Sequence, residues 1–214
     1  MSRDRWKPIE RELRRTAGPL IAGVDEVGRG PLAGPVVACA VIMPPDVRAI
    51  AGVDDSKRLT ARARERLAVK IRQRAVSVGI GAASVREIDR VNIYQATIIA
   101  MRRALKRLNV KPDCVLIDGN PIRSLEIPHT AIIGGDDACY TIACASIVAK
   151  VTRDRYMKTA DALYPAYGFG SHVGYITPDH TRIVRERGPC EIHRRSWRAR
   201  AYLPAEAPAE ASAG

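Results

Sequence analysis

The most informative stretch of the chain reads Ile21-Ala22-Gly23-Val24-Asp25-Glu26-Val27-Gly28-Arg29-Gly30-Pro31. Its apolar start, flanked by glycine, is typical of a buried strand. Asp25 and Glu26 stand at the mouth of that strand, where carboxylates are costly to desolvate unless a positive group holds them. A divalent metal ion would do so, and hard oxygen ligands favour Mg²⁺ or Mn²⁺. Because consecutive strand residues face opposite sides of a sheet, both acids can serve one site only if Gly28 and Gly30 break the strand into a loop.

Two later stretches repeat this arrangement of an apolar strand followed by an acid beside glycine. Residues 114–119 end in Asp118 and a glycine, and residues 130–133 lead through two glycines to Asp136. Any one of these acids alone would more often be a turn aspartate. If the strands are neighbours, the acids converge at one rim of the sheet. Such a cluster, without a Ser-His pair or a P-loop, fits two-metal phosphoryl chemistry.

The apolar patterns predict alternating strands and helices. We expect strands at residues 20–27, 34–43, 76–84, 114–119 and 130–133, and helices at residues 60–76, 92–108, 138–160 and 177–188. Thr60 is a suitable N-cap, Asn92 followed by Gln95 resembles a capping box, and Pro178 suits a first helical position. This order indicates an α/β fold with a mixed sheet flanked by helices, followed by a small C-terminal helical region.

The composition points to a polyanionic partner. The chain has 214 residues, of which 46% are hydrophobic, so a substantial core can form without disulfides. Lys and Arg number 35 against 23 Asp and Glu, which gives a net charge of +12. This excess favours nucleic acid as partner, although a basic protein can also lack one. A membrane surface is disfavoured, because no basic amphipathic helix carries aromatics on its apolar face.

The cysteines and the termini indicate a reduced, cytoplasmic protein. The 5 cysteines include no Cys-x-x-Cys pair, which argues against a zinc ribbon. The first residues lack an apolar signal region, and no stretch approaches the apolar length of a membrane span. Residues 1–18 show helical spacing of apolar side chains, and residues 203–214, rich in Pro, Ala and Glu, are expected to be disordered.

Eight sequence blocks follow one another in a specific order. They are residues 25–36 (DEVGRGPLAGPV), 55–59 (DSKRL), 117–119 (IDG), 135–136 (GD), 142–154 (IACASIVAKVTRD), 164–169 (YPAYGF), 172–175 (HVGY) and 193–196 (HRRS). In this order they resemble the ribonuclease HII family, the type 2 ribonucleases H. The resemblance extends over roughly residues 20–197.

The resemblance implies a ribonuclease H-like fold, with a five-stranded mixed sheet flanked by helices. It implies a catalytic core at residues 19–165 and a helical substrate-binding region at 166–202, between an N-terminal extension (1–18) and a disordered tail (203–214). The implied activity is cleavage of the RNA strand of RNA–DNA hybrids. Incision 5′ of single ribonucleotides embedded in duplex DNA is also implied, leaving 3′-hydroxyl and 5′-phosphate ends. A monomer acting in ribonucleotide excision repair and DNA replication is expected.

The family's four metal-binding acids carry over to Asp25, Glu26, Asp118 and Asp136, which would hold two Mg²⁺ or Mn²⁺ ions. One ion would lower the pKa of the attacking water and the other would stabilise the leaving 3′ oxygen. Asp25 is expected to be the ligand shared by both ions. Asp137 competes with Asp136 for the last place, and Asp136 has the family's spacing to the serine at position 146.

Substrate recognition is expected at a glycine-rich loop and a tyrosine. The backbone of Gly28, Arg29 and Gly30 can approach a ligand closely and could sense the ribose 2′-hydroxyl. In the family this loop contacts the ribonucleotide, and Tyr175 matches a tyrosine that packs on the following deoxyribose. From the residues alone, a plain tight turn and a partly buried aromatic remain the alternatives.

Basic side chains supply further candidate contacts to phosphates. Lys57 and Lys150 lie within two of the blocks. A set of late arginines could grip a duplex and make affinity depend on salt, namely Arg182, Arg185, Arg187, Arg194, Arg195, Arg198 and Arg200. Some of these could instead form a solvated helix face, and Arg194 and Arg195 could be structural ion-pair partners.

Two other functions stay open on the residues. Another two-metal nuclease of the same superfold, such as a junction resolvase, would cut an all-DNA four-way junction. A non-catalytic nucleic-acid-binding module would be expected to lack the clustered acids, since uncompensated carboxylates repel phosphate. Cleavage of a duplex that contains one ribonucleotide would separate these functions.

Overall fold

A five-stranded mixed sheet forms the centre of the molecule, as the sequence predicts. The structure is a computed structural model that describes residues 6–45 and 48–196. The strands are β1 (Ile21–Val27), β2 (Val36–Ile42), β3 (Ser77–Ala83), β4 (Cys114–Asp118) and β5 (Thr130–Ile132). Their order is β3-β2-β1-β4-β5. β1–β2 and β2–β3 pair antiparallel, whereas β1–β4 and β4–β5 pair parallel, so the carboxyl ends of β1, β4 and β5 share one rim.

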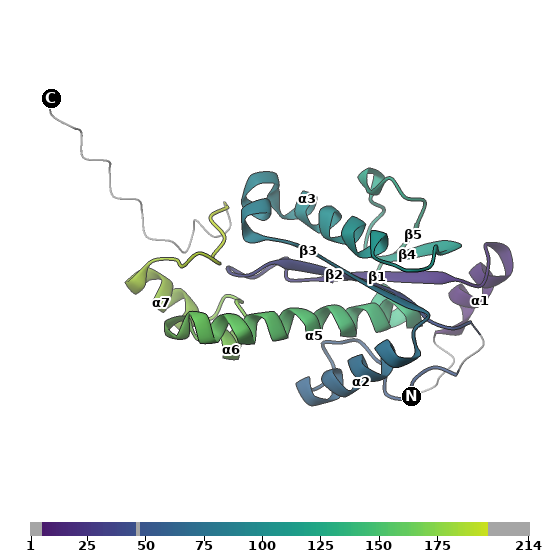
Figure 1. Cartoon of the computed structure of the whole chain (residues 1–214), viewed down its shortest axis with the longest axis horizontal. Coiled ribbons are helices and arrows are strands. Elements are labelled where there is room, and N and C mark those ends of the chain that lie inside the picture. Colours follow the sequence, from purple (N-terminus) through teal and green to yellow (C-terminus); the bar gives the residue numbers. More distant parts are fainter. Residues whose placement is uncertain (1–5, 46–47, 197–214) are drawn as a thin grey trace, which may run out of the picture.

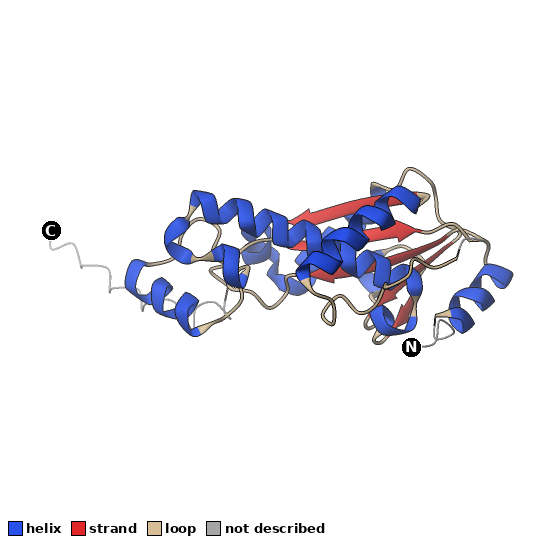
Figure 2. Ribbon diagram, turned by 90° about the horizontal axis from the view of Figure 1, so that it is seen from below, coloured by secondary structure: helices blue, strands red, loops and turns tan. Residues whose placement is uncertain are grey.

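Helices cover both faces of the sheet (Figures 1 and 2). The helix α3 (Val85–Lys106) lies on one face, and α2 (Ala61–Arg74) and α5 (Tyr140–Leu163) lie on the other. The α5 backbone approaches β1 closely at Gly23, where an added Cβ would lie 2.3 Å from the carbonyl carbon of Thr141. Only glycine allows this approach, so Gly23 brings the start of α5 beside the strand that carries Asp25.

Two helix boundaries differ from the sequence prediction. The helix α3 begins at Val85, because Ser84 and Glu87 form a capping box upstream of the expected start. Asn92 instead marks a kink inside α3, with φ of 70°, and its side chain accepts the N–H of Gln95 at 3.1 Å. The predicted cap at Asn92 therefore exists, but it restarts a helix rather than beginning one.

The helix expected at residues 138–160 is divided at its start. The short helix α4 (Gly135–Ala138) is separated from α5 by extended backbone at Cys139. The α2 N-cap at Thr60 and the start of α7 (Pro178–Arg187) after Thr177 are as expected. A single turn, η1 (Arg123–Leu125), lies between β4 and β5.

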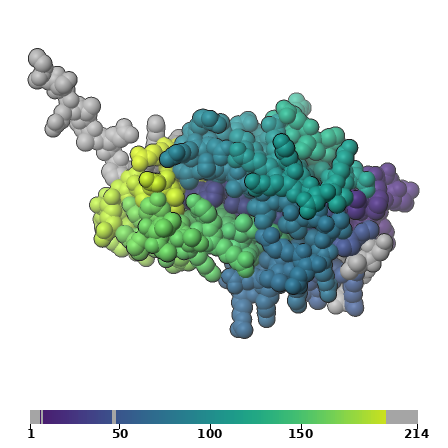
Figure 3. Space-filling view, viewed as in Figure 1, coloured from purple at the N-terminus to yellow at the C-terminus, as the bar shows by residue number. Residues whose placement is uncertain are grey.

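The remaining helices lie at opposite ends of the molecule. The helix α1 (Lys7–Thr16) packs at one end, and η2 (Pro165–Tyr167), α6 (Phe169–His172) and α7 gather at the far end of α5 (Figure 1). Figure 3 shows the yellow segment after α7 lying against the start of α3, where the Asp89 carboxylate accepts the N–H groups of Arg195 and Ser196. None of the helices in the described ranges combines the length and apolarity that crossing a membrane requires. The tail 203–214 and the first five residues lie outside these ranges.

Candidate active site

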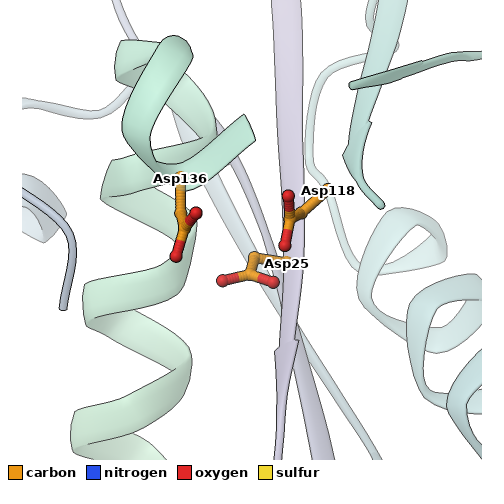
Figure 4. A group of neighbouring side chains, drawn as sticks. All are labelled: Asp25, Asp118 and Asp136. Carbon is orange, nitrogen blue, oxygen red and sulfur yellow. The ribbon is translucent and has the colours of Figure 1, made fainter. Parts of the chain in front are cut away.

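Three aspartates from different elements converge at the carboxyl rim of the sheet. Carboxylate oxygens of Asp25, Asp118 and Asp136 all lie within 4.8 Å of one another. Figure 4 shows the three side chains pointing toward a common space beside α5. Asp25 and Asp136 are buried, and Asp118 is half-buried. Such a set of hard oxygen atoms can bind a divalent cation.

Parallel strand pairing explains why these acids meet. Val24 on β1 pairs with Ile117 on β4, so the next residues, Asp25 and Asp118, stand side by side at the strand ends. The third acid follows β5, the strand beside β4, through a turn at Gly134 with φ of 67°. The turn is anchored to the site, because the Gly135 N–H donates to Asp118 Oδ1 at 2.7 Å.

The electrostatics of the cluster favour a bound cation. Burial, followed by the charges of Glu26 and Asp118, raises the pKa of Asp25 well above its usual value. Burial also raises the pKa of Asp118, and the charge of Asp136 adds to the effect. Asp25 and Asp118 are therefore costly to ionise beside each other. A divalent ion would relieve this repulsion, so the donor set fits the metal chemistry that the sequence predicts.

Two serines form a chain of hydrogen bonds that ends at the Asp25 carboxylate. Ser146 on α5 hydrogen-bonds to the Asp25 carboxylate and opposes the rise in its pKa. The Ser146 hydroxyl in turn lies 2.9 Å from the hydroxyl of Ser56, and both serines are buried. Neither serine was predicted as a site residue, although each lies in one of the blocks that carry the family resemblance. Their role depends on a contact across 90 residues, which no local pattern reveals.

The structure does not place Glu26 in the three-aspartate cluster. The strand break expected after Asp25 occurs only beyond Val27, so both acids remain in β1. Glu26 instead lies 3.3 Å from the guanidinium of Arg29. Burial raises the pKa of Glu26, Arg29 lowers it, and the charge of Asp118 raises it. Glu26 thus lies outside the three-aspartate cluster but close enough to Asp118 for their charges to interact.

The neighbouring Asp136 and Asp137 have different surroundings. Asp136 faces the cluster, and its Oδ2 lies 3.3 Å from Lys57 Nζ. Burial lowers the pKa of Lys57, but the charge and hydrogen bond of Asp136 outweigh it and the pKa is raised. The Asp137 side chain is 50% exposed and pairs with Arg58 at 3.1 Å. The structure thus brings Asp136 and Lys57, rather than Asp137, to the acidic site.

The glycine-rich loop follows the acids directly, and Tyr175 lies above α5. Arg29 and Gly30 are exposed, and the space beside the Gly30 Cα is open. Tyr175 is 39% exposed, and Lys150 Nζ lies 5.6 Å from the centroid of its ring. Lys150 also forms an ion pair with Asp154 at 2.8 Å. Lys150 therefore sits beside Tyr175 rather than among the acids.

One of the predicted phosphate-binding arginines is buried. Arg194 is only 3% exposed, and its guanidinium donates to backbone carbonyls of the loop that follows β1. The prediction of a phosphate contact is therefore wrong for Arg194. Arg182, Arg185, Arg187 and Arg195 are not buried and stay candidates. Arg198 and Arg200 lie outside the described residues.

Comparison with solved structures agrees with this geometry. The ribonuclease H2 of Pyrococcus horikoshii OT3 superposes with a TM-score of 0.72 at 28% identity, over 86% of this chain and 96% of that one. The fold is also similar to that of Bst-RNase HIII in complex with Mn²⁺, with a TM-score of 0.62 at 21% identity, over 81% of this chain and 65% of that one. A mixed sheet with clustered acids at its central strand ends is thus a ribonuclease H-like fold, and the class of protein is a ribonuclease H.

Sequence comparison narrows this class. The family model for ribonuclease HII matches residues 22–200. The ribonuclease HII of Paraburkholderia xenovorans (strain LB400) is 52% identical over 182 residues, which cover 85% of this chain and 73% of the relative. The chain belongs to the ribonuclease HII family. It is accordingly an endoribonuclease of RNA–DNA hybrids in a family that depends on divalent metal ions.

Proposed function

We propose that this enzyme, besides cleaving the RNA of hybrids, incises duplex DNA on the 5′ side of a single embedded ribonucleotide. The observation that carries the proposal is the adjacency of the acidic cluster to an exposed glycine-rich loop. Only two residues separate Asp25 from Gly28 in the chain, and Gly30 faces open space. A backbone that lies this close to the reacting phosphate can sense the 2′-hydroxyl, the one group that distinguishes ribose from deoxyribose.

The acids would hold two Mg²⁺ or Mn²⁺ ions. Asp25, Asp118 and Asp136 are the proposed ligands, with Asp25 shared between the ions and Glu26 as the fourth. When bound, the ions would activate the attacking water and stabilise the leaving oxygen, giving 3′-hydroxyl and 5′-phosphate ends. Ser146 holds the Asp25 carboxylate in place, and the Gly135 N–H holds that of Asp118.

The substrate contacts follow from what surrounds the acids. Gly28, Arg29 and Gly30 would contact the ribonucleotide, and Tyr175 would pack on the following deoxyribose. Lys57, beside Asp136, and Lys150, beside Tyr175, would meet phosphates at two points along the strand. We infer that the protein works as a monomer in the cytoplasm, in ribonucleotide removal and DNA replication.

A cleavage assay tests this function. A duplex with one ribonucleotide, an all-DNA duplex, a long RNA–DNA hybrid and an all-DNA four-way junction are each incubated with Mg²⁺, with Mn²⁺ or with EDTA. We expect metal-dependent cuts in the hybrid and at the single ribonucleotide, with 5′-phosphate products. A cut in the hybrid alone would refute recognition of single ribonucleotides, and cleavage of the junction would favour a resolvase.

A further inference from the structure

Two buried arginines hold the loop that follows the catalytic strand. Arg194, near the end of the described chain, is 3% exposed, and Arg153 on α5 is 0% exposed. All their guanidinium hydrogen bonds within the described residues go to backbone carbonyls. Arginine suits this task, because its planar group presents five N–H donors in a fixed fork.

The carbonyls bound by Arg194 belong to the glycine-rich loop. Arg194 donates to the carbonyl of Arg29 at 2.8 Å, to that of Gly34 at 2.9 Å and to that of Gly28. Arg153 holds the same loop from its other side, through the carbonyls of Ala33 at 2.9 Å and Pro35 at 3.0 Å. The conformation of the loop is thus set by side chains from two distant parts of the chain.

The geometry of the peptide bond, together with these contacts, fixes the direction in which the N–H groups of the loop point. The peptide bonds of the loop are trans, and in a planar trans peptide the C=O and the N–H point in opposite directions. The carbonyls of Gly28 and Arg29 point inward at Arg194, so the N–H groups of Arg29 and Gly30 must point away from it. In the described part of the chain neither N–H has an acceptor. Both N–H groups can therefore donate a hydrogen bond to a ligand that is bound beside the acidic cluster.

Further hydrogen bonds of the surrounding backbone hold Arg194 in its position. Its own N–H donates to the Leu32 carbonyl at 2.8 Å, and the Gly34 N–H donates to the Ile192 carbonyl at 2.9 Å. The next two N–H groups in the chain are bound by the Asp89 carboxylate on α3. Arg153 extends the arrangement to the tyrosine segment, since it also binds the carbonyl of Val173 at 2.9 Å. Val173 has φ of 44°, which a β-branched residue keeps only under such constraint.

We propose that Arg194 is a positioning residue that aims the N–H groups of Arg29 and Gly30 at the ribose 2′-hydroxyl by drawing the adjoining carbonyls inward. The inference rests on the proposed recognition of a ribonucleotide by this loop and adds the residue that makes the loop selective. A hydroxyl oxygen that accepts both N–H groups is bound well only when the two donors converge. Without the guanidinium fork the peptides can rotate, and the selectivity for ribose is lost before general binding is lost.

Binding measured in EDTA separates selectivity from catalysis. Dissociation constants are measured by fluorescence anisotropy for a duplex with one ribonucleotide and for the matched all-DNA duplex. In Arg194→Lys a single ammonium cannot reach three separated carbonyls. We expect the preference for the ribonucleotide duplex to fall roughly tenfold, as for the loss of one net hydrogen bond to the ribose hydroxyl, with the affinity for all-DNA duplex unchanged. The control Arg74→Lys alters an exposed arginine at the end of α2 and should leave the preference unchanged.

Hydrogen exchange gives a readout that does not depend on substrate. Arg194→Lys should speed amide exchange across residues 28–35, while the central strands remain protected. If Arg194→Lys does not fold, Arg194→Gln buries no unpaired charge and should show the same two effects. A wild-type preference in a folded variant would overturn the proposal. If the wild-type enzyme itself binds both duplexes equally, the proposed recognition fails, and unchanged exchange at residues 28–35 then overturns the role of Arg194 as well.

Discussion

At the scale of single residues, Asp25 destabilises the metal-free protein although it is a proposed metal ligand. Its carboxyl group is buried, and like charges surround it, so in the metal-free protein its ionisation opposes folding. The folded pKa lies above the unfolded one. The stability of the protonated form is therefore complete below the unfolded pKa and is lost as the pH rises through the folded pKa. A residue chosen for stability alone would be neutral here.

We predict that Asp25→Asn stabilises the metal-free protein and abolishes its activity. At pH 7 the melting temperature in EDTA should rise by about 2–4 °C, the shift that 1 kcal/mol produces in a domain of this size. The gain should shrink toward pH 4, where Asp25 is protonated. Hybrid cleavage should fall by more than the roughly 100-fold that supporting residues of metal sites cost. Melting curves across pH and cleavage at saturating Mg²⁺ check this, and a near wild-type rate would contradict it.

The adjacent pair Asp136 and Asp137 provides a matched comparison. Both changes to Asn remove one negative charge one residue apart, but only Asp136 faces the other acids. We predict that Asp136→Asn reduces kcat/KM on hybrid far more than Asp137→Asn. Losing the exposed pair of Asp137 with Arg58 should cost less than about 1 kcal/mol of stability. The reverse order of activities would move the ligand to position 137.

Tyr175→Ala should separate the two substrates. A single ribonucleotide offers only one binding register, so lost packing on the next sugar cannot be offset by binding elsewhere on the strand. We predict a loss of roughly tenfold at the single ribonucleotide, the low end of what an aromatic stack contributes, and a smaller loss on a long hybrid. Tyr156→Ala removes another exposed α5-side ring as control. Equal losses of kcat/KM on both substrates would indicate a structural role.

At the scale of elements, the C-terminal helices are joined by a cluster of three histidines, of which His180 and His193 are buried. His180 Nε2 lies 3.0 Å from His193 Nε2, and His172 stacks on His180 with ring centroids 4.2 Å apart. His180 Nδ1 also lies 2.8 Å from the carbonyl oxygen of Tyr175. The cluster therefore ties α6 and α7 to the segment that carries the tyrosine and to Arg194, the residue after His193.

This cluster should make the C-terminal region sensitive to acid. Burial, followed by the charge of His180, lowers the pKa of His193 to about 4. A lowered folded pKa means stability that is present above the unfolded value of 6.5 and lost as the pH falls toward 4. We predict that the melting temperature of His193→Asn falls less steeply over this window than that of the wild type. Asp25 contributes a pH dependence of the opposite sign to both proteins, so its contribution cancels when the two slopes are compared. Equal slopes would contradict the prediction.

At the scale of the whole molecule, the excess of basic residues sets how the substrate is held. The net charge of +12 coexists with a compact negative cluster at the site, so binding must come from basic side chains around it. We predict that the dissociation constant for a hybrid in EDTA rises at least roughly tenfold between 50 and 200 mM NaCl, as release of counterions from two or more phosphates requires. Anisotropy titrations at several salt concentrations check this, and an affinity independent of salt would contradict it.

Short stretches of sequence were sufficient to predict most helices and strands, because caps and apolar periodicity involve residues that are neighbours in the chain. Thr60 before α2 and Thr177 before α7 accept the N–H groups that begin each helix, as their sequence context suggested. The predicted start of α3 at Asn92 was wrong, because a capping residue at a kink within a helix has the same sequence signature as one at the start of a helix. The sequence pattern also missed the break at Cys139, which follows from where α4 must place Asp136.

The sequence alone was enough to indicate a sheet with acids at its strand ends and a carboxylate-based phosphoryl chemistry, because apolar periodicity and glycine positions are encoded by neighbours in the chain. Tertiary structure decided which acids meet and what surrounds them. Parallel pairing of β1 with β4 put Asp118 beside Asp25, whereas Glu26 pairs with Arg29 outside the three-aspartate cluster. The sequence suggested either a phosphate contact or an ion-pair partner for Arg194, yet its guanidinium lies buried against backbone carbonyls of residues 28–34. Burial and contact between distant residues are properties of packing, and no local pattern contains them.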